Sequence, residues 1–209
     1  GAVHNLALKQ DGTVVAWGNN DWGQGSVPSG LSGVTAIAAG DYHSLALKQD
    51  GTVVAWGYNY SGQASVPAGL TGVTAIAAGG GHNLALKQDG TVVAWGSNMY
   101  GEGSVPVGLS GVTAIAAGRD HNLALKQDGT VVAWGANFYG QVSVPAGLSG
   151  VTAIAAGEFH SLALKQDGTV VAWGEDTYEP AMGSVPAGLS GVTAIAAGGG
   201  HNLALKSGA

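Results

Sequence analysis

The sequence predicts an all-β protein, a β-propeller of four-stranded antiparallel blades. Three observations predict it: a fixed repeat, a hairpin signal inside each repeat, and apolar segments that lack helical period. The segments KQDGTVVAWG and GVTAIAAG each occur five times unchanged, 39 residues apart except for a two-residue insertion before Ser184. Such self-similarity is typical of repeat architectures, in which each unit buries its apolar face against the next.

The first half of a repeat, taken from the third copy, predicts two strands and a tight turn. Residues 73–78 (VTAIAA) are β-branched or small, which suits the crowded innermost strand of a blade. Residues 82–87 alternate, with Leu84 and Leu86 on one face. Asp89-Gly90 follows, and a DG pair between apolar strands is a strong hairpin signal because glycine accepts positive φ.

The second half of the repeat completes the expected blade. Residues 91–95 are apolar on both faces, as in a sheet that is covered on both sides. A fourth strand around 104–106 ends in Pro106, which cannot donate to a ladder and therefore belongs at the outer edge. Four such strands, radially repeated, are typical of propeller blades. A β-solenoid is the main competitor, but its coils are usually shorter and lack repeated DG hairpins.

The ends of the chain raise the question of ring closure. The second strand occurs six times and the other strands five times. We predict one domain over 1–209 with five blades, one of them built from both termini, and six incomplete blades as the alternative. In a five-bladed ring, Leu6–Leu8 and Leu203–Leu205 compete for one place. One of them should be displaced, or swapped into a neighbouring chain, so a monomer and a strand-swapped homo-oligomer are both open.

The run GxxHNLALKxDGTVVAWGxNxxGQ resembles the regulator-of-chromosome-condensation repeat family, and the likeness covers the whole chain. It rests on the AAG turn, the histidine after it, the DG hairpin and the Trp-Gly pair. Bacterial-type relatives with a VPxGLSGVTAIAAG linker look most alike. The resemblance implies a β-propeller. The founding member is a seven-bladed exchange factor for a small GTPase that also docks on chromatin. Since this chain has shorter repeats and no inserted loop to act as a wedge, exchange activity is not expected.

Differences between the repeats concentrate at two places, the pair after AAG and the segment after Trp-Gly. Connections between antiparallel strands alternate between the two ends of a blade, so both variable places should lie on one face of the disc. The constant framework carries six lysines and five aspartates, or +1. The variable segments carry eight acids against Arg119, or −7, which accounts for the net charge of −6.

Aromatic residues gather in the same variable segments, and aromatics among polar loops on a rigid scaffold are typical of recognition surfaces. We therefore expect this acidic, aromatic face to bind a protein or peptide, and its charge favours a basic one. Acidic charge disfavours nucleic acid, and no apolar run is long enough to span a membrane. The residues predicted to contact the partner are Trp22, Asp41, Tyr42, Tyr58, Tyr60, Tyr100, Arg119, Asp120, Phe138, Tyr139, Glu158, Phe159, Glu175, Asp176 and Tyr178.

Other conserved-looking positions within the repeat are expected to be structural. The six histidines recur once per blade, so they are spread around a ring and cannot converge on one metal ion; we expect hydrogen bonding at the hairpin entrance. The DG aspartates are expected to be turn residues and the Trp-Gly tryptophans to pack between blades. No nucleophile–base motif or phosphate-binding glycine loop occurs, so we expect neither an enzyme nor a cofactor. The compartment stays undecided.

Three alternative functions remain open. Loop aromatics could stack on glycans, although repeated glycan sites should repeat their residues. The near-identical repeats could mark a recently amplified or engineered propeller with no dedicated ligand. Nucleotide exchange on a small GTPase rests on the family analogy alone.

Overall fold

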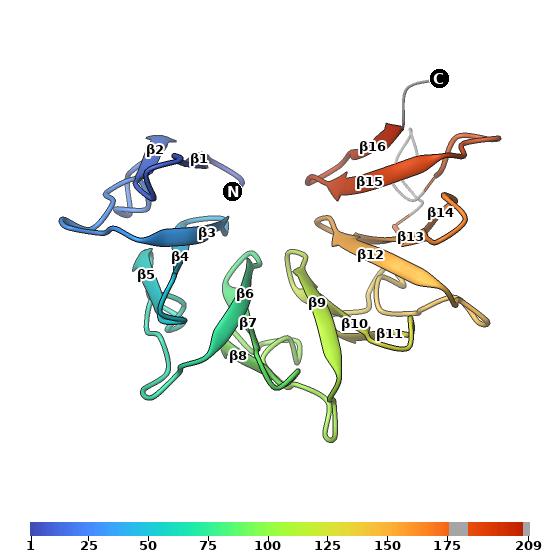
Figure 1. The fold of residues 1–209 in the computed structure, drawn as a ribbon, viewed down its shortest axis with the longest axis horizontal. Coiled ribbons are helices and arrows are strands. Elements are labelled where there is room, and N and C mark those ends of the chain that lie inside the picture. The colour runs from blue at the N-terminus through green and yellow to red at the C-terminus, as the bar shows by residue number, and fades with distance from the viewer. Residues whose placement is uncertain (176–183, 207–209) are drawn as a thin grey trace.

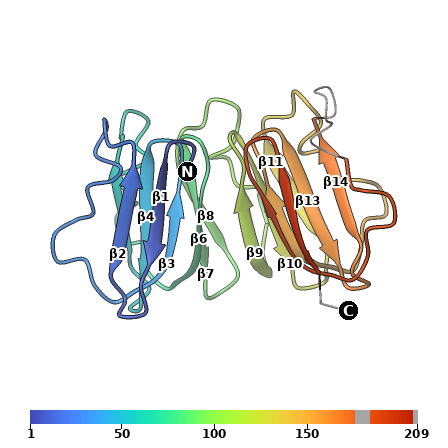
Figure 2. The same ribbon diagram turned by 90° about the horizontal axis from the view of Figure 1, so that it is seen from above.

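The computed structural model describes residues 1–175 and 184–206, and these form 16 β-strands and no helix. Six antiparallel sheets stand radially around an axis in an open ring, which confirms the predicted all-β propeller architecture (Figure 1). Figure 2 shows that the strands run roughly along this axis.

The four central sheets have three strands each. Their strands are β3 (Val34–Ala39), β4 (His43–Lys48) and β5 (Val53–Gly57); β6 (Val73–Ala78), β7 (His82–Lys87) and β8 (Val92–Gly96); β9 (Val112–Ala117), β10 (His121–Lys126) and β11 (Val131–Gly135); β12 (Val151–Ala156), β13 (His160–Lys165) and β14 (Val170–Gly174). The two terminal sheets have two strands each, namely β1 (His4–Leu8) with β2 (Val14–Gly18), and β15 (Val192–Ala197) with β16 (Asn202–Lys206).

The segment expected to form a fourth strand is not a strand in any repeat. In the first repeat, Ser26 N donates to Gly23 O at 3.0 Å and Val27 N donates to Gly25 O at 3.1 Å. Pro28 follows and has no N–H. Since these turns use the available donors, none is left for a ladder, and each complete blade has three strands.

The ring also differs from the closed five-bladed arrangement. β1–β2 and β15–β16 are separate sheets, so the blade expected to be shared by both termini is not formed. The alternative of six blades, incomplete at both ends, describes the chain instead. β1 and β16 carry the same kind of strand, and both cannot fill one place in an antiparallel blade. The assignment of 1–209 to a single domain stays a prediction.

The DG hairpin forms as the sequence predicts. Gly90 has φ of 76°, in the left-handed region where glycine is unstrained. Asp89 Oδ1 accepts hydrogen bonds from Thr91 N at 3.0 Å and from Thr91 Oγ1 at 2.6 Å. The turn therefore sets the register in which Leu86 pairs with Val92.

The hydrophobic core lies between blades. One face of a blade contributes leucines and alanines, and the facing side of the next blade contributes a tryptophan. Between the second and third sheets, Leu45 and Leu47 pack with Ala85 and Trp95, and all four are less than 9% exposed. The same arrangement recurs at the neighbouring interfaces, so each of the four central blades is stabilised by both neighbours.

A buried polar chain runs beside this core and confirms the structural role expected for the histidines. His43 Nε2 lies 2.7 Å from Asn83 Oδ1 of the next blade, and Asn83 Nδ2 donates to Gln63 O at 2.8 Å. Trp95 Nε1 donates to the same carbonyl oxygen at 3.2 Å. Because Asn83 uses its amide hydrogen on Gln63, its oxygen accepts from His43, which fixes the histidine as the Nε2–H tautomer.

Glycines let neighbouring blades approach closely near the axis. A Cβ on Gly79 would overlap the His82 ring and would lie 2.5 Å from Gly118 O of the next blade. Backbone hydrogen bonds link the same turns around the axis, for example Gly80 N to Arg119 O at 2.9 Å. Only glycine permits this approach, which explains the constant AAG sequence.

Candidate recognition surface

The two variable parts of each repeat meet at one end of the ring. Tyr58 N, after β5, donates to Tyr42 O, before β4, at 2.9 Å. Ser97 N and Gly81 O form the equivalent bond in the next blade, also at 2.9 Å. The constant hairpin turns lie at the other end of the strands, as antiparallel pairing requires. The predicted placement of both variable sets on one face is therefore observed.

The largest aromatic cluster spans the first two blades. Tyr58 lies at its centre, 4.8 Å from Trp22, 6.4 Å from Tyr42 and 6.4 Å from Tyr60 between ring centroids. Tyr60 is 88% exposed and Trp22 is 55% exposed. Offset and edge-to-face contacts at these distances are favourable, so the rings support one another while their outer faces stay in water.

Two further aromatic pairs continue around the same end. Tyr100 and Phe138 meet edge to face at 5.2 Å, and Tyr139 lies 4.9 Å from Phe159. Phe138 is exposed and Tyr139 is partly so. Each pair joins neighbouring blades, so the exposed aromatic area runs across blade boundaries.

Buried polar side chains hold these loops in shape. Gln63 Oε1 accepts a hydrogen bond from Ser61 N at 2.9 Å. Glu102 occupies the equivalent position in the next blade. Glu102 Oε2 accepts from Tyr100 N at 2.7 Å, and its Oε1 accepts from Ser97 Oγ at 2.5 Å. Burial alone would raise the pKa of Glu102, but these hydrogen bonds outweigh it and lower the pKa. Glu102 is therefore an ionised side chain that stabilises its own loop, although the sequence analysis included it in the charge of the variable segments.

The charged group of the surface lies beside the axis. Arg119 forms ion pairs with Glu158 and, at 3.8 Å, with Asp120. Its guanidinium also lies 5.8 Å from the Phe159 ring centroid. The Glu158 hydrogen bond raises the pKa of Arg119. Burial raises the pKa values of Asp41 and Asp120.

An open cavity of about 430 Å³ lies on the axis at this end. Its wall is the constant AAG sequence of the blades, and its mouth carries Asp41, Arg119 and Glu158. Small wall residues and a charged mouth leave it without the apolar lining of a typical small-molecule pocket.

Not every predicted contact residue belongs to this surface. Glu175 is fully buried, so it cannot contact a partner, and it stands directly after β14, with Glu175 N bonded to Phe159 O at 2.9 Å. Asp176 and Tyr178 lie outside the described residues. Conversely, Met99 is 76% exposed beside Tyr100 and was not predicted. Its place in the variable segment after Trp-Gly was the available signal.

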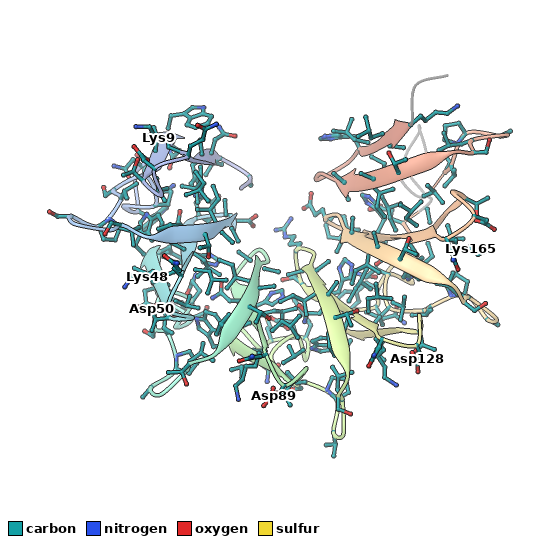
Figure 3. All side chains as sticks on the ribbon, in the orientation of Figure 1. Lys9, Lys48, Asp50, Asp89, Asp128 and Lys165 are labelled. Atoms are coloured by element: carbon teal, nitrogen blue, oxygen red, sulfur yellow. The ribbon has the colours of Figure 1, made fainter. Side chains whose placement is uncertain are left out.

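The opposite end of the ring is uniform. Lys48 Nζ lies 3.1 Å from Asp50, which also accepts from Thr52 N and Oγ1. The Thr52 hydrogen bonds lower the pKa of Asp50 to about 2. Figure 3 labels such lysines and aspartates around the outer part of the ring. The DG aspartates are turn residues, as expected.

The described part of the chain has neither a cluster of metal-ligating side chains nor a membrane-spanning helix. Within 1–175 and 184–206, no three histidine, cysteine or acidic side chains are grouped as a metal site requires. The same residues include no helix with the length and hydrophobicity of a membrane span.

Several solved structures share the fold. Yeast RCC1 (Prp20) bound to Kap60 superposes with a TM-score of 0.82 at 24% identity, over 99% of this chain and 66% of that chain. Prp20p from Saccharomyces cerevisiae gives 0.79 at 23% identity, over 97% and 66%. Human WBSCR16 gives 0.80 at 22% identity, over 99% and 70%. The chain thus spans 66% of the length of the yeast protein, and no curated protein sequence matches it.

A family model places the repeats directly. The model of the regulator of chromosome condensation (RCC1) repeat matches residues 1–24, 34–63, 73–102, 112–141 and 151–179. These matches cover more than half of the chain and follow the blades observed in the structure. The chain belongs to the RCC1 repeat family.

Proposed function

We propose that this protein is a non-enzymatic scaffold whose aromatic loop face binds a basic protein or peptide. The observation that carries the proposal is the gathering of exposed aromatic side chains at one end of a constant framework. Trp22, Tyr60 and Phe138 are each more than half exposed and come from three different loops. Large exposed aromatics are frequent anchors of protein interfaces.

The charge of the chain supports a basic partner. The net charge is −6, and the residues that are constant between repeats contribute none of the excess. Asp41 and Glu158 stand at the axial mouth with Arg119, and Asp120 lies 3.8 Å from Arg119. Complementary charge speeds association and selects among partners. Among the structural neighbours, yeast RCC1 (Prp20) is described in complex with Kap60 and with binding properties toward Gsp1p and histones. These are consistent with a protein partner here.

The test is selection of peptides from a random displayed library on the purified chain. We expect the selected peptides to be rich in lysine or arginine and to bind one face. The triple variant Trp22→Ala, Tyr60→Ala, Tyr139→Ala should weaken their binding at least tenfold with an unchanged unfolding midpoint. The control is a triple variant at the other end of the ring, which should bind normally. It combines three exposed positions, Gln49→Ala, Gln88→Ala and Gln127→Ala. Equal binding by both triple variants would contradict the proposal.

Glycan binding is the second candidate, with weaker support. Its support is the stacked pair Tyr58–Tyr60, whose rings are 15° from parallel. The three aromatic clusters differ in composition, whereas a lectin with one site per blade would repeat its residues. A glycan array with hits that the Tyr60→Ala variant loses would favour this candidate over peptides.

A further inference from the structure

The axial cavity opens at the same end of the ring as the aromatic loops. Figure 1 shows the innermost strands β3, β6, β9 and β12 around the axis. The cavity has a volume of about 430 Å³, and small residues such as Ala78 and Ala117 form its wall. The charged side chains that line it are Asp41, Arg119 and Glu158, which stand at its mouth. Any selectivity for a charged ligand therefore comes from these three side chains.

The charges at the mouth are unevenly paired. Arg119 forms ion pairs with Glu158 and, at 3.8 Å, with Asp120. Asp41 also lines the cavity, but within the part of the chain that the structure describes its carboxylate forms no ion pair and accepts no hydrogen bond. Asp41 is therefore the acid at this mouth that is left for a cation from outside.

An unpaired charge at Asp41 is unfavourable, because the residue is partly buried. Burial raises the pKa of its carboxyl group, and the positive charges of Arg119 and the Gly1 amino group only partly oppose the shift. A partly buried carboxylate gains more from a cation placed against it than an exposed one does, since water screens the pair less. The ligand favoured at this point is positively charged.

Gly80 leaves one side of the Asp41 carboxylate accessible. A Cβ at Gly80 would lie 3.2 Å from Asp41 Oδ2 and 2.9 Å from Arg119 O. The equivalent positions in three other blades carry the side chains of Asp41, Arg119 and Glu158. Any side chain at Gly80 would therefore stand against the oxygen that a ligand has to reach.

Tyr42 connects the cavity to the largest aromatic cluster. It lines the cavity next to Asp41, and its ring centroid lies 6.4 Å from that of Tyr58 at the centre of the cluster. Aromatic faces attract cations and also pack against the apolar parts of a peptide. A peptide that places a basic side chain at Asp41 can therefore also cover the exposed ring of Tyr60, which stacks on Tyr58.

We propose that the mouth of the axial cavity binds one lysine or arginine side chain of the partner, held by the Asp41 carboxylate beside Tyr42. This inference rests on the proposed function, because it names the part of a basic peptide that the loop face selects. The charged group of the partner forms the ion pair that Asp41 lacks within the described chain, and the alkyl stem packs on Tyr42.

The first test uses the complete chain, labelled for amide NMR, and two small probes, n-butylammonium and n-butylguanidinium, at constant ionic strength. We expect at least one probe to shift the amide signals of Asp41, Gly80 and Arg119 saturably, with a dissociation constant on the order of 10 mM. The tighter probe shows whether lysine or arginine fits better. Uncharged n-butanol should not shift these signals.

Matched variants show whether Asp41 holds the probe. Asp41→Asn should weaken binding of the probe at least fivefold. Asp21→Asn removes the same charge from an exposed loop position outside the cavity and should leave binding unchanged. Arg119→Gln should strengthen binding, because it removes the cation that competes at the mouth.

The second test uses the peptides selected on the loop face. Replacing each basic residue of one such peptide by norleucine in turn should reveal one position whose loss weakens binding at least tenfold. On the Asp41→Asn variant the same replacement should have little further effect, because both changes remove one ion pair. Fully additive effects would overturn the proposal.

The two tests distinguish this inference from the proposed function. Peptides that depend on Trp22 and Tyr60 but not on Asp41 would support the proposed function and overturn the axial site. If no peptide is selected, the proposed function fails, and the two probes alone decide the axial site. No shift at roughly 100 mM of either probe, or shifts that Asp41→Asn does not weaken, would overturn it.

Discussion

The contacts between blades and the loops at one end of the ring behave in opposite ways within every repeat. Between blades the same residues recur and are buried, as with His43, Asn83 and Trp95. At the loop end the residues differ from blade to blade and many are exposed, as with Trp22 and Tyr60. The difference teaches that the residues that stabilise the ring are separate from the exposed loop residues that we propose bind a partner. Variation in the loops is tolerated because the hydrogen bonds that hold the ring lie beneath them.

The largest expected effect is a loss of stability in acid, caused by the buried histidines. Burial lowers the pKa of His43 to about 4 and that of His121 to about 3, against 6.5 for the unfolded chain. As pH falls below 6.5 the unfolded chain binds protons that the folded chain refuses, so stability decreases. Each histidine lowers the free energy of unfolding by about 1.4 kcal/mol for each pH unit below 6.5. The two together lower it by about 5 kcal/mol between pH 6.5 and 4.5. Asp41 and Asp120, with raised pKa values, act in the opposite direction.

Urea unfolding at a series of pH values measures this effect. An unfolding free energy that is flat between pH 6.5 and 4.5 would show that the histidines titrate normally, and the contrast between framework and loops would lose its main support.

The next largest effect is expected for Gly79→Ala. The new methyl group would overlap the His82 ring and approach Gly118 O to 2.5 Å, so the neighbouring blades must move apart. We expect a loss of about 3 kcal/mol in unfolding free energy. Gly81→Ala, two residues along the same turn, is the control, because its Cβ meets only Ser97 Cβ at 3.4 Å. Similar midpoints for the two variants would refute the role given to the axial glycines.

A smaller effect is expected for Asn83→Ala, which removes the bonds to His43 and Gln63 at once. Buried polar groups that lose their hydrogen-bond partners lower the free energy of unfolding by about 2 kcal/mol. Asn83→Ser should recover much of the loss, because Ser44 makes both bonds in the preceding blade, at 2.8 Å to His4 and 2.9 Å to Gln24 O. Asn5→Ala, at the exposed equivalent, should change stability by less than about 0.5 kcal/mol.

Much of the framework could be predicted from the sequence, and the ring closure could not. The DG turn at Asp89-Gly90 and the alternation of Leu84 and Leu86 act locally, so the pattern predicts them. The prediction of a strand at the proline-ended segment was wrong. The backbone donors of Ser26 and Val27 are used in turns that no sequence pattern indicated. Whether the duplicated strand joins or separates the terminal blades depends on contacts across the whole ring.

The position of the candidate surface could be predicted from the sequence, but the burial of its individual residues could not. Strand alternation predicts that both variable sets share one end, and the bond between Tyr58 N and Tyr42 O places them together. Burial of single loop residues was not predictable. Glu102 and Glu175 have the composition of surface acids, yet both are fully buried. Only the equivalence of Glu102 with Gln63 and Gln141 could have indicated its structural role.

The smallest effect on stability is expected for Glu102→Gln. Glu102 lies in a variable loop, but its side chain is buried like those of the constant framework. In Glu102→Gln the side-chain oxygen can still accept from Tyr100 N, as Gln141 Oε1 accepts from Tyr139 N at 2.9 Å. We expect a change below about 1 kcal/mol in unfolding free energy. Binding of basic peptides should be unaffected, because the carboxylate is buried and faces its own loop.

Glu158→Gln is the matched variant, since it removes one charge from the mouth of the axial cavity. It also removes the ion pair between Glu158 and Arg119, so that Arg119 keeps only Asp120, at 3.8 Å, as an acidic partner. We expect binding of basic peptides to weaken several-fold, measured by fluorescence polarisation at low and high salt, with the difference reduced in high salt. If Glu102→Gln weakened binding as much as Glu158→Gln did, total charge alone would govern recognition, and the separation of buried framework acids from exposed loop acids would have no functional meaning.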